Sequence, residues 1–156
     1  RPAIERGLIY FPQKALDAHP SDYGLSAEDL TVTTRDGLRL RGWWIRGPGE
    51  TVFLLFHGNA GNVSHRLERA RFLVEDLGAS LVLVDYRGYG ESEGRPSEKG
   101  LYEDGQAIYD AAVRRGVEPG RIVLFGESLG SAVAIETALR RPCRAVILEA
   151  AFSSAR

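Results

Sequence analysis

Methionine is absent from the 156 residues, and the sequence begins at Arg1. Because a translated chain starts with methionine, we expect these residues to be a processed or truncated piece of a longer product. A signal peptide or membrane anchor is one kind of segment that processing removes from this end of a chain. We therefore leave two locations open, the cytoplasm and a membrane to which such a segment attached the protein.

Cysteine, excess charge and long apolar runs are also scarce. Cys143 is the single cysteine, which excludes an internal disulfide. The 20 basic and 21 acidic side chains nearly cancel, and this balance argues against nucleic acid or an anionic membrane surface as a partner. No apolar run approaches the roughly 20 residues that span a bilayer. Hydrophobic residues make up 44% of the sequence, which is typical of a globular domain with a proper core.

No repeat or linker divides the chain, so we interpret residues 1–156 as one incomplete domain. Residues 1–28 form an irregular arm that contains Pro12 and Pro20, and we expect its apolar part, residues 8–11, to pack on the sheet edge. Residues 29–156 supply the sheet and the helices. They open with a hairpin over residues 29–45, which turns at Asp36-Gly37.

Behind the hairpin, buried strands alternate with helices. Continuous apolar runs predict strands at 52–56, 81–84, 122–125 and 145–148, and helical spacing predicts helices at 63–77, 97–116 and 128–141. This alternation predicts an α/β fold with a mainly parallel sheet and helices on both faces. Ligands of such folds bind at the carboxyl ends of the strands.

The pattern Gly-x-Ser-x-Gly occurs twice, around Ser92 and around Ser128. A nucleophilic serine needs a sharp turn from a strand into a helix, so that its hydroxyl stands clear of the sheet. Ser128 has a buried strand before it and a helical pattern after it, whereas Ser92 lies in a charged, glycine-rich segment ahead of Pro96. We therefore predict that Ser128 is the nucleophile and that Ser92 is a loop residue.

A helix that begins at Ser128 also directs unpaired N–H groups toward a reacting carbonyl group. The backbone N–H of Leu129 is one predicted donor to the oxyanion. We expect the second donor to come from the loop after the first parallel strand, because the glycines of this loop allow its backbone to approach a ligand closely. Within the loop, we predict that the N–H of Asn59 is this donor.

Three motifs in this order, HGNAGN (57–62), DYRGYGES (85–92) and GESLGS (126–131), resemble the α/β-hydrolase superfamily. They are most similar to its small single-domain esterases, depalmitoylating thioesterases and aminopeptidase-like enzymes. The resemblance implies a serine, histidine and aspartate triad, an oxyanion hole from Asn59 and Leu129, and no cofactor, but it does not identify the substrate. We expect a small acyl ester or thioester, because no feature of the sequence, such as an acidic pocket for a free amine, indicates a peptide. The resemblance extends from about Leu8 to the last residue.

The sequence departs from the family in its triad, because the family order is serine, then acid, then histidine. Only 28 residues follow Ser128, and none is a histidine. The upstream histidines are expected to be structural or solvent-facing and not to act as the base: His19, His57 and His65. We therefore hypothesise that a missing C-terminal part, or a second chain, completes the fold. The fragment alone would then be inactive, and strand 145–148 would expose an apolar edge.

Three acidic residues lie close to the predicted site. Asp85 matches a residue that organises loops in the family, and Glu149 is a candidate for the acid, with hydrogen bonding to loop backbone as its alternative role. Glu127 either tunes the pocket or is a solvated side chain.

Two other classes of function stay open at this stage. One is a catalytically inactive, hydrolase-like binding module, and the other is a peptidase of the same fold. A nucleotide-binding Rossmann fold is disfavoured, because no helix opens after Gly88 and Gly90 to hold a pyrophosphate.

Overall fold

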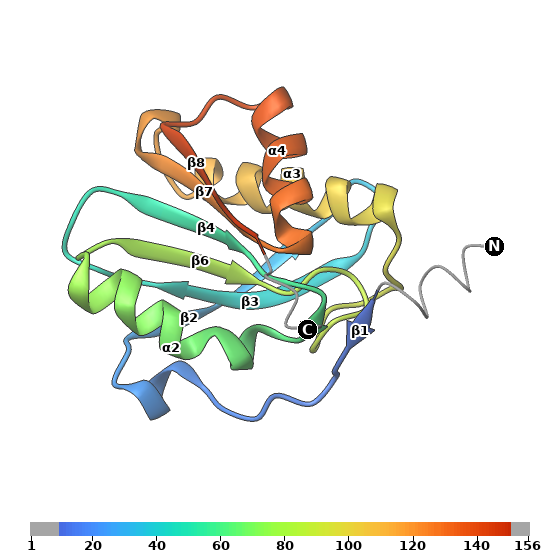
Figure 1. The fold of residues 1–156 in the computed structure, drawn as a ribbon, viewed down its shortest axis with the longest axis horizontal. Helices are drawn as coiled ribbons and strands as arrows, with labels where there is room; N and C mark the ends of the chain where they lie inside the picture. The colour runs from blue at the N-terminus through green and yellow to red at the C-terminus, as the bar shows by residue number, and fades with distance from the viewer. Residues whose placement is uncertain (1–9, 151–156) are drawn as a thin grey trace.

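A six-stranded sheet forms the centre of the protein in a computed structural model that describes residues 10–150 (Figure 1). The strand order is β2-β3-β6-β4-β7-β8. The strands span Ala27–Thr33 (β2), Arg39–Ile45 (β3), Val52–Phe56 (β4), Ser80–Val84 (β6), Ile122–Glu127 (β7) and Ala145–Glu149 (β8). β6, β4, β7 and β8 are parallel, and β2 and β3 are antiparallel to their neighbours. The predicted α/β fold with a mainly parallel sheet is confirmed.

The opening hairpin is the one predicted, with a small shift of its first strand. Its turn is closed by hydrogen bonds from the Thr34 N–H to the Leu38 carbonyl (2.9 Å) and from the Gly37 N–H to the Thr34 carbonyl (3.0 Å). β2 starts at Ala27, two residues before the predicted start, because Ala27 still pairs with Ile45 at the end of β3. The sheet therefore takes up the last residues of the predicted arm.

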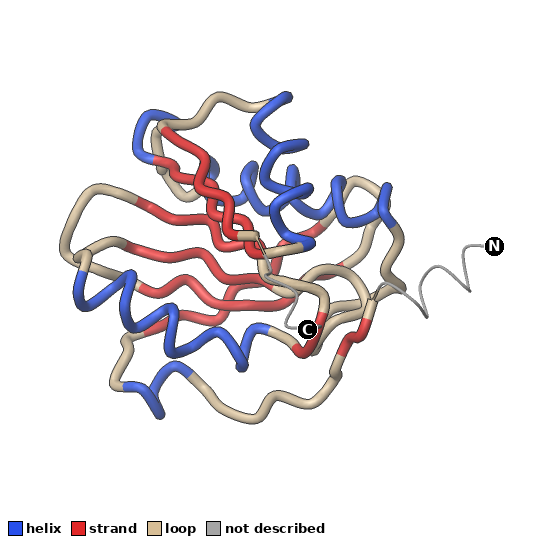
Figure 2. The backbone as a smooth tube through the Cα atoms, viewed as in Figure 1, coloured by secondary structure: helices blue, strands red, loops and turns tan. Residues whose placement is uncertain are grey.

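Helices lie on both faces of the sheet, as predicted (Figure 2). They are α2 (Leu67–Arg71), α3 (Glu98–Arg114) and α4 (Leu129–Arg140). Ser97 caps α3 by accepting a hydrogen bond from the Gly100 N–H at 3.0 Å. The predicted continuous helix at 63–77 instead consists of a 3₁₀ turn (η2, Val63–Arg66), α2 and a π-helical turn (η3, Phe72–Asp76). The wider π turn rotates the end of this segment, so Leu73 is buried while Leu77, at the end of the predicted helix, is exposed.

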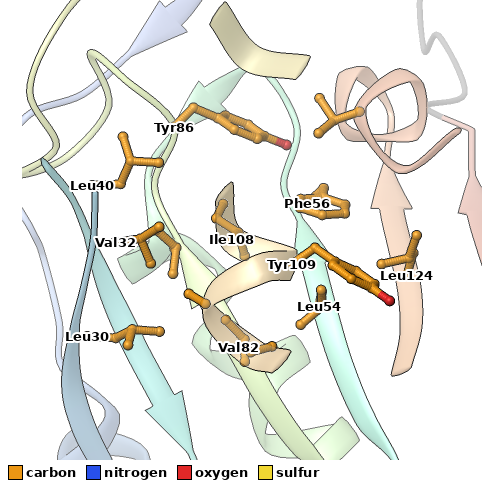
Figure 3. Packing of buried hydrophobic residues seen from close by; sticks show 14 of the residues in the cluster. Leu30, Val32, Leu40, Leu54, Phe56, Val82, Tyr86, Ile108, Tyr109 and Leu124 are labelled. Atoms are coloured by element: carbon orange, nitrogen blue, oxygen red, sulfur yellow. The ribbon is translucent and has the colours of Figure 1, made fainter. Parts of the chain in front are cut away.

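Alternate residues of the three inner parallel strands, β6, β4 and β7, enter two separate apolar cores. Leu54 and Phe56 of β4 join the core on the side of α3 and α4, where they pack near Ile108 and Tyr109 (Figure 3). Phe53 and Leu55 of β4 join the core under α2. Because both faces are buried, the strand reads as a continuous apolar run.

β8 is an edge strand among the described residues, and its apolar side chains are solvent-exposed. Val146, Ile147 and Leu148 have exposed fractions of 38%, 41% and 48%. The predicted apolar edge is confirmed. No helix within residues 10–150 is long and apolar enough to cross a membrane.

The described part of the apolar arm is divided between two environments. Tyr10 is buried in the core on the side of α3 and α4, whereas Phe11 is 54% exposed and does not pair with an edge of the main sheet. Phe11–Pro12 (β1) pairs in parallel with Ala60–Gly61 (β5), a short strand in the loop after β4. Leu8 and Ile9 lie outside the described residues. The loop carbonyls at 59 and 61 accept hydrogen bonds from the arm N–H groups on either side of Pro12, which has none to donate. The arm then passes through a 3₁₀ turn (η1, Pro20–Tyr23) into β2.

Candidate active site

Ser128 lies at the junction of β7 and α4 with an unusual backbone conformation. Its φ of 53° and ψ of −116° make it the one non-glycine residue with a positive φ among residues 10–150. Such strain is concentrated at functional sites. The turn is also tightly packed, because a Cβ at Gly126 would lie 2.5 Å from the Gly130 carbonyl oxygen and one at Gly130 would lie 1.9 Å from that of Phe56. Both glycines of the motif are therefore required by space, and Ser128 takes the sharp turn itself.

The amide of Leu129 occupies the first position of α4. N–H groups in the first turn of a helix lack intrahelical partners, and the helix dipole makes this end positive. The Ser128 N–H is held by the carbonyl of Glu149 at 2.8 Å, which ties the elbow to the end of β8. The predicted donor thus lies beside the predicted nucleophile, while its role in catalysis stays a prediction.

The exposed Ser128 side chain opens into a cleft of about 360 Å³. The lining residues come from the loop after β4, the start of the following helical segment, the elbow and the end of β8: Gly58, His65, Arg66, Glu127, Ser128, Glu149 and Ala150. Gly58 is close to the elbow, since a Cβ on it would lie 3.7 Å from that of Ser128. Asn59, the second predicted oxyanion donor, follows Gly58 directly, and its role is untested.

The carbonyl groups of residues 57–61, which we call the oxyanion turn, are all hydrogen-bonded. The donors, in order along the turn, are Tyr86 Oη (2.8 Å), His57 Nδ1 (2.7 Å), Phe11 N with Tyr89 Oη (3.0 and 2.9 Å), Arg66 Nη2 (2.9 Å) and Gln13 N (3.2 Å). The backbone of this turn is therefore fixed before any substrate arrives, as electrostatic stabilisation of an oxyanion requires. Burial raises the pKa of both tyrosines, so their hydroxyls remain protonated donors at neutral pH.

His57 and Asp85 are structural, as interpreted from the sequence. Both are buried, and His57 Nε2 lies 2.9 Å from Asp85 Oδ1. The same oxygen accepts the Val63 N–H at 3.0 Å, so Asp85 joins two loops at the carboxyl ends of β4 and β6. Neither residue lines the cleft.

His65 lines the cleft and is an exposed residue, as predicted. Its Nδ1 accepts the Asn62 N–H at 3.0 Å and its Nε2 lies 2.7 Å from Asp17 Oδ2, which leaves neither ring nitrogen for Ser128. His19 lies in the arm, with its ring edge-on to that of Trp43. Among residues 10–150, no histidine is hydrogen-bonded to the Ser128 hydroxyl.

Two arginines that sequence reasoning missed are paired with the two glutamates of the cleft. Arg66 Nε donates to Glu127 at 3.1 Å, and Arg69 Nη2 donates to both carboxylate oxygens of Glu149 at 2.9 Å. The side chain of Glu127 is only 13% exposed, so it is not a solvated side chain. The carboxylate of Glu149 binds Arg69 and not loop backbone, which was its predicted alternative role. The spacing of the arginines, three residues apart, predicts that they share one face of the helical segment, but it does not predict which glutamates they bind.

The sheet order, the strained serine between strand and helix, and the fixed turn beside it define an α/β-hydrolase. The comparison with known families agrees, since the model of the family described as serine aminopeptidase, S33, matches residues 47–156. The chain belongs to this family of α/β-hydrolases.

Similar proteins have been named in bacteria, plants and archaea. An uncharacterized protein of Mycobacterium tuberculosis is 44% identical over 155 residues, with 96% of this chain and 54% of the relative covered. The alpha/beta hydrolase domain-containing protein WAV2 of Arabidopsis thaliana is 38% identical over 166 residues, covering 97% and 53%. A solved esterase of Pyrococcus furiosus superposes with a TM-score of 0.71 at 25% identity, covering 83% and 52%. The chain spans about half the length of the curated relatives it matches.

Proposed function

We propose that the protein is a serine hydrolase that cleaves a small acyl ester or thioester through an acyl-enzyme on Ser128. The strained backbone of Ser128 above an open cleft is the observation that carries this proposal. A hydrolase-like binding module would have no use for a serine in this conformation, which costs roughly 1–3 kcal/mol and persists where function requires it.

In the proposed reaction, Ser128 Oγ attacks the acyl carbonyl carbon while its proton passes to a histidine base. The negative oxygen of the tetrahedral intermediate accepts hydrogen bonds from the N–H groups of Leu129 and Asn59. The intermediate then expels the alcohol or thiol, which takes the proton from the histidine. Water repeats the sequence on the acyl-enzyme and releases a carboxylic acid.

We propose that the acid and the histidine come from residues beyond this chain, either a C-terminal part of the same protein or a second chain. The engaged ring nitrogens of His57 and His65 support this proposal, as does the bidentate contact of Glu149 with Arg69. The exposed apolar edge of β8 offers a place for further strands to pair.

The charges in the cleft favour an ester or thioester over a peptide with a free amino terminus. An aminopeptidase needs a carboxylate that is available to bind the substrate ammonium group. Glu127 and Glu149 both line the cleft, but each is ion-paired with an arginine, so neither offers an uncompensated negative charge.

A fluorophosphonate probe followed by intact-mass spectrometry tests the proposed nucleophile in the protein at its full natural length. We expect one adduct in the wild type, one in Ser92→Ala and none in Ser128→Ala. An adduct that persists in Ser128→Ala, or a wild type that takes no label, would overturn the proposal. Ser92→Ala is the matched control, because it changes the serine of the other Gly-x-Ser-x-Gly segment.

A further inference from the structure

Residues 11–17 of the arm are joined to the loop that carries the oxyanion turn by hydrogen bonds along their whole length. Two are backbone bonds around β1, from the Phe11 N–H to the Asn59 carbonyl (3.0 Å) and from the Gln13 N–H to the Gly61 carbonyl (3.2 Å). At the other end, the Asp17 N–H donates to Ser64 Oγ at 3.0 Å. The arm thus supplies two of the donors that hold the carbonyls of the turn.

Asn62 is the buried residue through which the two segments are connected. Its Nδ2 group donates to the arm carbonyls of Gln13 (3.0 Å) and Ala15 (2.7 Å). Its Oδ1 accepts from the N–H and the hydroxyl of Ser64, and Asn62 thereby caps η2. Both donors and both lone pairs of the amide are satisfied, half toward the arm and half toward the loop, so no isosteric side chain can replace it.

A second connection, at the surface, reaches the cleft itself. Asp17 Oδ2 lies 2.7 Å from Nε2 of His65, whose Nδ1 accepts the Asn62 N–H. His65 lines the cleft with Ser128. The contacts therefore connect an exposed arm carboxylate, through the imidazole, to Asn62, the residue that directly follows the oxyanion turn.

We propose that residues 11–17 are a positioning element of the active site, which holds the oxyanion turn in its catalytic geometry through Asn62 and the Asp17–His65 pair. This inference rests on the proposed serine hydrolase function. Asn62, Asp17 and His65 act on the position of the turn and do not themselves touch the reacting atoms. Displacement of an oxyanion donor lowers the rate of the chemical step more than it lowers substrate affinity, because the donor contacts charge that develops in the transition state.

Three substitutions in the full-length protein test this role by steady-state hydrolysis of a p-nitrophenyl ester. Asp17→Ala removes the exposed contact, and we expect kcat to fall between about twofold and about tenfold with little change in KM. Asp17→Asn retains an oxygen acceptor for His65 and should recover most of the loss. Asn62→Asp replaces the two donors to the arm by acceptors, and we expect kcat to fall more than about tenfold.

Asp22→Ala is the matched control, because Asp22 is an exposed arm carboxylate whose hydrogen bond, to the His19 N–H, stays within the arm. We expect its kcat to equal that of the wild type. Amide hydrogen exchange at residues 59–62 supplies a readout that is independent of catalysis, and it should accelerate in Asp17→Ala but not in Asp22→Ala.

Unchanged kcat and unchanged exchange in Asp17→Ala would overturn the positioning role, even if its melting temperature falls. If Asn62→Asp does not fold, Asp17→Ala alone decides the test, because Asp17 is exposed and its substitution should not prevent folding. Failure of the underlying function is distinguishable, because Ser128→Ala would then hydrolyse the ester as fast as the wild type.

Discussion

The segments Gly90–Gly94 and Gly126–Gly130 share the pattern Gly-x-Ser-x-Gly and use it in opposite ways. In the first, the glycines adopt positive φ values of 52° and 86°, and Ser92 is buried in an ordinary conformation. Its hydroxyl donates to the Asp85 carbonyl and accepts the Arg41 N–H, both at 2.8 Å. In the second, the glycines provide space, and Ser128 takes the positive φ with its side chain exposed to the cleft.

The difference teaches that the pattern alone does not specify a nucleophile. What separates the two serines is the element on either side, because a strand followed at once by a helix forces a sharp turn at the serine. A loop distributes the same reversal of direction over several residues, and its serine is then available to satisfy buried backbone groups.

The largest expected effect is on activity, and it separates the two serines. Ser128→Ala should lower kcat/KM for ester hydrolysis by at least about a thousandfold, since only the oxyanion donors and binding remain. Ser92→Ala should stay within about threefold of the wild type, because its hydroxyl contacts only backbone. Initial rates with a p-nitrophenyl ester check both variants, and equal losses would remove the distinction between the segments.

The second effect is on folding, and it separates a glycine that is required by space from one that only adopts a positive φ. Gly130→Ala should destabilise the protein by more than about 4 kcal/mol, because the added methyl group would collide with the Phe56 carbonyl in a packed core. Gly116→Ala is the control, with a φ of 99° and no atom within 4 Å of the added methyl group, and should cost about 1 kcal/mol. Urea unfolding monitored by circular dichroism checks the ranking. Similar losses in both variants would show that the close contact at Gly130 adds no cost of its own.

The elbow was predictable from sequence because its signals are local. The apolar run 122–125, the glycines and the helical spacing after Ser128 lie within about twenty residues, and secondary structure follows directly from them. The same holds for the hairpin turn at Asp36-Gly37.

The contacts around the elbow were not predictable, because they join residues far apart in the chain. The pairing of Phe11 with Ala60 and the contact of Arg69 with Glu149 depend on tertiary distances that no periodicity encodes. The arm was assigned to the sheet edge because apolar residues favour burial there, whereas hydrogen bonding to an irregular loop decided its place. Asn62 and Arg66 were missed for the same reason.

The third effect is on stability and concerns the buried serine. Ser92→Ala should cost about 1–3 kcal/mol, because it leaves the Arg41 N–H and the Asp85 carbonyl without this partner in a buried site. Ser128→Ala, whose hydroxyl is exposed, should change the free energy of unfolding by less than about 0.5 kcal/mol. Chemical denaturation of both variants measures the difference. A larger loss from Ser128→Ala would mean that the elbow hydroxyl is structural.

The smallest effect has the opposite sign and measures the strain at the elbow. Ser128→Gly should stabilise the protein by about 1 kcal/mol, because glycine adopts the φ of 53° and ψ of −116° without a clash, partly offset by its greater freedom in the unfolded chain. Ser128→Ala keeps the Cβ and therefore keeps the strain, so only the glycine variant should gain. Both variants lose the hydroxyl, and a difference in their unfolding free energies thus isolates the backbone. If glycine gives no gain over alanine, the turn is unstrained, and the main physical support for a functional serine at this position is lost.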